Sequence, residues 1–221
     1  MSVELNDRAY VSIEKEVLAG LPAANYNKEI VIVDRNDGIR DAVAELRQSS
    51  IIGFDTETKP SFKKGEYHTI ALVQLSTPEK SFLFRINKIG LPQEVIDILE
   101  DRELLKVGLS IRDDFHNLAK IAEMNPQAFV ELQSYAKEFK ITDSSLSRLY
   151  GILFGERISK HQRLSNWEAE ELTDAQKNYA ALDAYACIRI YRYLKEGNFR
   201  PAESAYLKYH EETAEISEEE S

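Results

Sequence analysis

One short stretch strongly constrains the fold of this chain. Residues Ser50 to Thr58 read SIIGFDTET, an apolar run followed by two carboxylates one residue apart. The apolar run predicts a buried β-strand. Because strand side chains alternate between two faces, Asp55 and Glu57 should project to the same side. Two neighbouring anions repel each other, and a divalent cation that prefers oxygen ligands, Mg²⁺ or Mn²⁺, would neutralise them. The alternative is a strand that simply ends in polar loop residues.

The remaining pattern predicts one α/β domain. Apolar runs predict strands at 29–33, 51–57, 69–75, 81–86 and 104–109, with a further short one at 129–132. Helical spacing predicts helices at 39–48, 92–102, 110–124, 133–138, 144–154 and 173–196. The third and fourth strands lie so close in the chain that they should pair antiparallel. We therefore expect a mixed five-stranded sheet flanked by helices.

Three segments are expected along the chain. Residues 1–28 are interpreted as a helical extension, because Ala9 to Ala19 have helical spacing and Pro22 closes that segment. Residues 29–196 form the domain. Residues 197–221 are interpreted as an acidic tail, whose last part, Glu211 to Ser221, should be mobile and solvated.

Composition excludes some classes of protein. A formal net charge of -10 argues against a general binder of polyanions, although carboxylates that hold metal ions also count as negative in this tally. The single cysteine, Cys187, cannot form an intrachain disulfide and suits a reducing interior. No apolar run approaches the roughly 18 residues of a membrane span. We expect a soluble protein in the cytoplasm.

A third acid is expected from the helix at 110–124. Its buried stripe is formed by Ile111, Phe115, Leu118, Ile121 and Ala122. On a helical wheel Asp114 lies roughly 50° from the centre of this stripe, and Asp113 roughly 150° away. Asp114 should therefore face the sheet while Asp113 faces water. The alternative is that both are first-turn acids favoured by the helix dipole.

A fourth acid is expected from the last long helix. Asp183 falls near the middle of that helix's apolar face, where a carboxylate is costly unless it is paired or bound to metal. Tyr179 stands four residues earlier and hence beside it, with a hydroxyl able to orient a water molecule. A core hydrogen bond between Tyr179 and Asp183 is the alternative.

The most basic loop of the chain precedes that helix. Residues 157–167 carry Lys160 and Arg163, which could contact phosphates, and the only tryptophan, Trp167. A solvated loop anchored by Trp167 explains the composition equally well.

Together Asp55, Glu57, Asp114 and Asp183 make an all-oxygen set of the kind that holds two Mg²⁺ or Mn²⁺ ions about 4 Å apart. Such a pair stabilises the attacking and the leaving oxygen in a displacement at phosphorus. Phosphodiester hydrolysis is the reaction that this set favours.

The sequence resembles the DEDD 3′-5′ exonucleases of the ribonuclease H-like fold, in the subclass with tyrosine in the third motif. The resemblance rests on three ordered motifs, FDTE at 54–57, KVG at 106–108 through Asp114, and YAALDAY at 179–185. LSNW at 164–167, followed by Leu172, Thr173 and Gln176, is similar to the Werner-exonuclease and ribonuclease D branch. The resemblance to the family as a whole covers roughly residues 29 to 196.

The resemblance implies roles for individual residues. Asp55, Glu57 and Asp183 would bind one ion, Asp55 would also bind the second, and Asp114 would help directly or through water. Tyr179 would orient the water that attacks the terminal phosphodiester of DNA or RNA, releasing a nucleoside 5′-monophosphate from the 3′ end. Thr56 is assigned to substrate binding, together with Lys160 and Arg163, which are inferred from charge alone.

Other interpretations stay open. Thr58 stands where an aromatic often follows the glutamate in the Werner branch, which affects how the terminal base packs. A non-catalytic nucleic-acid-binding module on the same fold would be expected to lack one of the acids, and all four are present. An endonuclease of the same superfamily is a further alternative.

Overall fold

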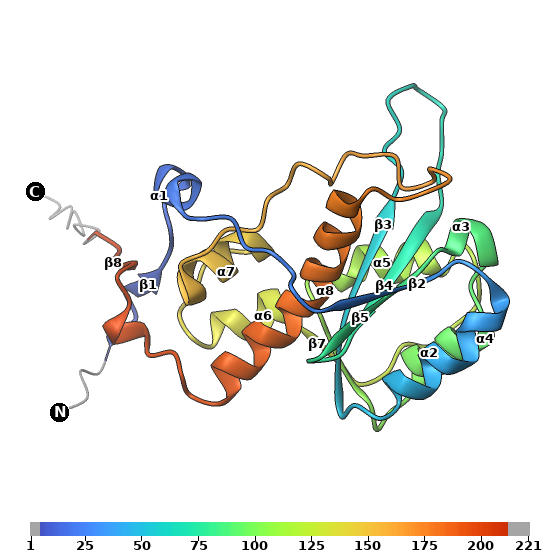
Figure 1. Ribbon diagram of the computed structural model, residues 1–221. Coiled ribbons are helices and arrows are strands. Elements are labelled where there is room, and N and C mark those ends of the chain that lie inside the picture. The colour runs from blue at the N-terminus through green and yellow to red at the C-terminus, as the bar shows by residue number, and fades with distance from the viewer. Residues whose placement is uncertain (1–4, 212–221) are drawn as a thin grey trace, which may run out of the picture.

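The computed structural model describes residues 5–211, and its centre is a mixed six-stranded sheet between two layers of helices (Figure 1). The strand order is β2-β5-β4-β3-β6-β7. Strand β4 runs antiparallel to both of its neighbours, β3 and β5, and the other neighbouring strands are parallel. The bounds are β2 (Glu29–Val33), β3 (Ile51–Thr58), β4 (Ile70–Ser76), β5 (Lys80–Phe84), β6 (Leu105–Gly108) and β7 (Phe129–Glu131).

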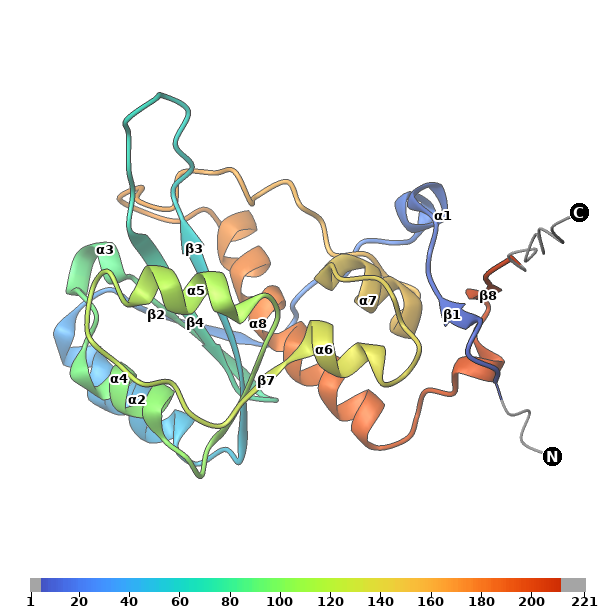
Figure 2. The ribbon, with the colours of Figure 1, turned by 180° about the vertical axis from the view of Figure 1, so that it is seen from behind.

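Helices cover both faces of the sheet, as Figures 1 and 2 show from opposite sides. One face packs against α2 (Ile39–Leu46), α4 (Gln93–Glu100) and α5 (Ile111–Leu118) in one hydrophobic cluster. The other face packs against α8 (Asp174–Lys195), and α6 (Leu132–Lys137) and α7 (Leu146–Phe154) pack in turn against α8. A short helix, α3 (Ile86–Ile89), follows β5, and a 3₁₀ turn, η1 (Asn36–Gly38), precedes α2. Within residues 5–211, no helix combines the length and apolar composition needed to span a membrane.

The sheet has six strands where the sequence led us to expect five. The additional strand is β7, which pairs in parallel with β6 at the edge of the sheet. The sequence predicts a short strand at 129–132, and what it does not predict is that this strand joins the sheet, because its pairing with β6 is a non-local contact. The predicted antiparallel pairing of β4 with β5 is confirmed.

The N-terminal extension differs from its prediction. Residues Ala9–Val11, expected to be helical, form strand β1, and the helix α1 is confined to Lys15–Gly20. Strand β1 pairs antiparallel with β8 (Leu207–Tyr209), which follows a 3₁₀ turn at Pro201–Glu203. The helical spacing was misleading because a partner strand from the far end of the chain decides the local structure here. Part of the expected acidic tail is therefore ordered, and residues 212–221 lie outside the described residues.

Helix α8 determines where the C-terminal half of the domain meets the sheet. A capping box begins it, in which Thr173 and Gln176 exchange side-chain and backbone hydrogen bonds. The helix then crosses β3 at Gly53, where a Cβ atom would lie 1.8 Å from the carbonyl oxygen of Ala184. Only glycine permits this approach of a helix backbone to a strand.

We expect Gly53→Ala to destabilise the protein by about 3 kcal/mol, the upper end of the cost of overpacking, because backbone atoms block the added methyl group. Gly20→Ala is the matched control, since nothing lies within 4 Å of its Cβ position. Chemical denaturation of both variants measures the difference, and equal stability would contradict the close packing described.

Candidate active site

Three carboxylates from two elements meet at one place. Asp55 and Glu57 of β3 and Asp183 of α8 each offer an oxygen atom, and these atoms lie within 4.8 Å of one another. Glu57 and Asp183 are only 7% and 6% exposed, whereas Asp55 is half-buried. Among the described residues, this is the group of acids that could hold a metal ion.

The backbone explains why these three side chains converge. Alternation along β3 sends Asp55 and Glu57 to the same face of the sheet. That face is the one that α8 crosses, and Asp183 immediately precedes Ala184, whose carbonyl fits against Gly53. The close approach of helix and strand therefore brings a helical carboxylate to two strand carboxylates.

The three carboxylates of this cluster are unfavourable as anions unless a cation lies beside them. Burial, reinforced by the charges of Asp183 and Asp114, raises the pKa of Glu57 to about 9. Burial raises the pKa of Asp183 to about 7, and it holds the pKa of Asp55 well above its ordinary value, with Asp183 adding to the effect. The Oδ1 atom of Asp183 is buried and accepts no hydrogen bond from the described residues. A buried, unpaired oxygen among like charges fits a bound cation.

Asp114 lies beside the cluster but is not one of its three converging acids. It is half-buried and Asp113 is exposed, as the helical wheel predicts. Its carboxylate accepts a hydrogen bond from the hydroxyl of Thr56, which lies on β3 between the two acids. Burial raises the pKa of Asp114 to about 6, although this hydrogen bond opposes the shift. The hydroxyl of Thr56, which we expected to contact substrate, is thus engaged by Asp114.

One residue that orients this site was not recognised from the sequence. The carboxylate of Glu131 accepts hydrogen bonds from the backbone N–H groups of Ser110 and Ile111, at 3.0 and 2.9 Å. These groups begin α5, and Ser110 has the left-handed φ of 61° that a non-glycine residue adopts at some cost. Glu131 therefore fixes the start of the helix that carries Asp114. Its place at the end of a three-residue strand gave no signal in the sequence.

Lys160 and Arg163, the cations of the basic loop, line a cavity together with Asp183. A cavity of about 300 Å³ is lined in part by Lys160, Arg163, Tyr179 and Asp183. Burial dominates the raised pKa of Asp183 and of Glu57, and the positive charges of Lys160 and Arg163 respectively offset a small part of that rise. The side chain of Trp167 is fully buried beside Tyr179, with ring centroids 6.1 Å apart. The tryptophan therefore anchors the loop while its two cations line the cavity.

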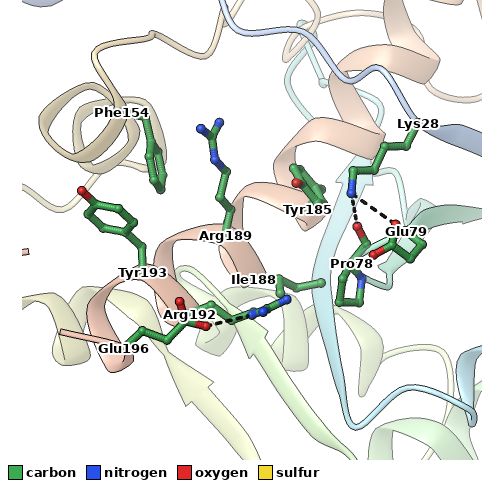
Figure 3. A pocket seen from close by; sticks show the side chains of 10 residues that line it. All are labelled: Lys28, Pro78, Glu79, Phe154, Tyr185, Ile188, Arg189, Arg192, Tyr193 and Glu196. Atoms are coloured by element: carbon green, nitrogen blue, oxygen red, sulfur yellow. Dashed lines mark hydrogen bonds and ion pairs between the residues drawn. The ribbon is translucent and has the colours of Figure 1, made fainter. Parts of the chain in front are cut away.

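A different pocket, of about 310 Å³, lies against the part of α8 that follows these residues (Figure 3). Its walls include three cations and several aromatic rings. Each cation already has an acidic partner: Lys28 pairs with Glu79, Arg189 with Glu156 and Arg192 with Glu196. Among the described residues, each cation that lines this pocket is therefore already in an ion pair.

Comparison with known proteins identifies the family. A family model described as 3′-5′ exonuclease matches residues 30–197. The mouse bifunctional 3′-5′ exonuclease/ATP-dependent helicase WRN is 35% identical over 160 residues, which cover 70% of this chain and 11% of that protein. An Arabidopsis thaliana 3′-5′ exonuclease is 31% identical over 155 residues, covering 66% of this chain and 53% of that one. The chain thus spans from about a tenth to about half of the length of these relatives.

Solved structures agree on the fold. The EXO domain of Aedes aegypti Nibbler superposes with a TM-score of 0.69 at 22% identity, covering 82% of this chain and 97% of that one. Escherichia coli RNase D superposes with a TM-score of 0.67 at 21% identity, covering 77% of this chain and 45% of that one. The fold is therefore the ribonuclease H-like α/β fold of these exonuclease domains. With a family match over residues 30–197, the chain belongs to the DEDD 3′-5′ exonuclease family, in the branch of WRN and RNase D.

Proposed function

We propose that this chain is a metal-dependent 3′-5′ exonuclease that hydrolyses phosphodiester bonds from the 3′ end of DNA or RNA and releases nucleoside 5′-monophosphates. The observation that supports this most directly is the convergence of Asp55, Glu57 and Asp183, with one buried oxygen left unbonded. Such an arrangement is unfavourable without a cation. The free-energy cost of burying these carboxylates is explained if they bind the metal ions of a reaction.

The residues suit two Mg²⁺ or Mn²⁺ ions. Asp55, Glu57 and Asp183 would hold one ion, Asp55 would share the second, and Asp114 would contribute directly or through water. When bound, the ions would stabilise the attacking and the leaving oxygen at phosphorus. Thr56 supports this arrangement from the protein side, because its hydroxyl holds the carboxylate of Asp114 in place.

Tyr179 would position the attacking water. Burial and the charges of Asp183 and Glu57 raise the pKa of its hydroxyl far above the ordinary value. The phenol therefore stays protonated, so that it orients water or a phosphate oxygen by hydrogen bonding and does not act as a base. Lys160 and Arg163, which line the same cavity, would hold the phosphate groups of the substrate.

The substrate class is nucleic acid with a free 3′ end. A Trypanosoma brucei RNase D, 20% identical, has been solved in complex with RNA U12, which supports a strand of this chemistry as the ligand of the shared fold. A cytoplasmic location remains a prediction; Cys187, on which it partly rests, is a buried free thiol.

A strand labelled at its 5′ end tests the proposal. With Mg²⁺ or Mn²⁺ we expect stepwise shortening from the 3′ end, and no shortening with a chelator. Asp55→Ala should abolish the activity, because it removes the acid expected to contact both ions. Exposed Asp113→Ala serves as the control and should leave the rate unchanged. Lack of metal-dependent cleavage on both DNA and RNA would refute the activity.

A circular single strand separates this proposal from an endonuclease. It has no 3′ end, so it should stay intact while a linear strand of the same sequence is degraded. Cleavage of both forms at the same rate would rule out the exonuclease assignment.

A further inference from the structure

The connection between β3 and β4 projects beyond the rest of the domain (Figure 1). This hairpin loop, residues 59–69, has the sequence KPSFKKGEYHT. Phe62 and Tyr67 in it are 79% and 91% exposed, so their rings lie almost entirely in water. Two exposed aromatic rings so close together are unusual unless they serve recognition.

Exposed hydrophobic side chains occur in two loops that connect to elements of the candidate active site. Among the described residues, five large hydrophobic side chains are exposed: Val17, Phe62, Tyr67, Leu164 and Tyr209. Two of them belong to the hairpin loop, and Leu164 belongs to the basic loop at 157–167 that carries Lys160 and Arg163. Strand β3 leads from Asp55 and Glu57 directly into the hairpin loop. Phe62 and Tyr67 therefore lie in the loop that directly follows the two strand acids, and Leu164 adjoins Arg163, which lines the cavity beside Asp183.

The charge of the hairpin loop opposes that of the whole chain. Residues 59–65 contain three lysines and no acid, in a protein of net charge -10. Lys63 and Lys64 are exposed, and no ion pair joins either of them to any of residues 5–211. This differs from the pocket beside α8, where every cation is paired. The loop thus offers free positive charge between two aromatic rings.

The base of the hairpin loop is fixed. Glu168 forms an ion pair with Lys59, at 3.3 Å between Nζ and Oε2, and lies 2.9 Å from Nδ1 of His68. These contacts tie both ends of the loop to the segment that follows Lys160 and Arg163, and Figures 1 and 2 show the two segments side by side. The base of the loop is therefore held against the segment that follows Lys160 and Arg163.

Aromatic rings alternating with cations are the chemistry that binds single-stranded nucleic acid. Each base can stack on a ring, and each phosphate can pair with a lysine, without dependence on sequence. We propose that the hairpin loop 59–69 holds the single strand upstream of the terminal nucleotide. Bases stack on Phe62 and Tyr67, and phosphates contact Lys63 and Lys64. This inference rests on the proposed function, since it places the reacting 3′ end at the three carboxylates.

Comparing a long with a minimal substrate tests this inference. The first is a single strand of about 20 nucleotides, longer than a typical binding site of this kind. The second is a dinucleotide, which we expect to be too short to extend from the carboxylates to the loop. For Phe62→Ala combined with Tyr67→Ala we expect kcat/KM on the long strand to fall at least about tenfold through a higher KM. The rate on the dinucleotide should not change. Tyr209→Ala, which removes an exposed ring from β8, is the matched control and should match the wild type on both substrates.

The contribution of Lys63 and Lys64 is tested separately by the salt dependence of Kd. For Lys63→Gln combined with Lys64→Gln, the slope of log Kd for the long strand against log salt should fall in magnitude by about 1.4, or about 0.7 for each lost phosphate contact. Lys15→Gln, exposed on α1, should leave the slope unchanged. A loop with only a structural role would not alter this slope.

Binding in the presence of a chelator keeps the two proposals distinguishable. If the wild type cleaves neither substrate, the proposed function fails. Fluorescence anisotropy of the labelled long strand still measures how tightly the loop variants bind it. Weaker binding of both loop variants supports the inference even then. If the loop variants bind and cleave the long strand as the wild type does, the inference is overturned, and the loop becomes a candidate surface for an acidic protein segment.

Discussion

Asp183→Asn should reduce exonuclease activity at least about 10³-fold and, at the same time, stabilise the metal-free protein. The activity falls because the variant loses one of three converging carboxylates and with it the charge stabilisation of several kcal/mol that a bound ion contributes. The stability rises because a neutral amide replaces a buried acid that has carboxylates as neighbours and one oxygen without a hydrogen bond.

Thermal melts with and without metal separate these effects. In a chelator the Asp183→Asn variant should melt above the wild type, with each kcal/mol gained worth about 2–4 °C in a chain of this length. Adding Mg²⁺ should raise the Tm of the wild type and leave the variant nearly unchanged, because only the wild type binds the ion tightly.

Exposed Asp113→Asn is the control for the loss of one negative charge. It should change neither the activity nor the Tm in either condition. An Asp183→Asn variant that is active, or that melts below the wild type in the chelator, would contradict a charge-strained cluster at this position.

The sequence was most informative where the local pattern and the tertiary environment agree. The run through Asp55 and Glu57 has a strand period, and α8 has a capping box and a buried face, so both elements appear where they were predicted. The family resemblance is also confirmed. The choice of Asp114 over Asp113 as the half-buried acid followed from the helical period alone, because that period fixes which side chains face the sheet.

The remainder depends on contacts that no local pattern contains. Residues Ala9–Val11 became a strand because β8, almost two hundred residues later, pairs with them. The roles of Glu131, which caps α5, and of Gly53, which admits α8, each depend on a partner distant in sequence. The exposure of Phe62 and Tyr67 likewise required the structure, since an aromatic residue in a loop can equally well be buried.

The second large effect that we expect is a metal-free protein that loses stability as the pH rises. In the folded chain the pKa of Asp183 is raised to about 7 and that of Glu57 to about 9, and the pKa of Asp55 is also raised. In the unfolded chain these groups return to ordinary values of about 4. Between about pH 4 and pH 9 the native state therefore holds protons that the unfolded state has released. Raising the pH across this window favours unfolding.

Metal ions should reverse this dependence. Binding requires deprotonated carboxylates, so Mg²⁺ or Mn²⁺ displaces the protons that the native cluster retains and stabilises the folded state increasingly as the pH rises. Melts at several pH values, with chelator and with Mg²⁺, measure the effect, and calorimetry in buffers of different ionisation enthalpy counts the protons released. The variant that combines Asp55→Asn with Asp183→Asn should have a flatter profile in the chelator and no response to metal. If the wild type without metal gained stability between pH 5 and pH 8, its carboxylates would already be stabilised as anions by the protein, and a cation would not be needed to hold them together.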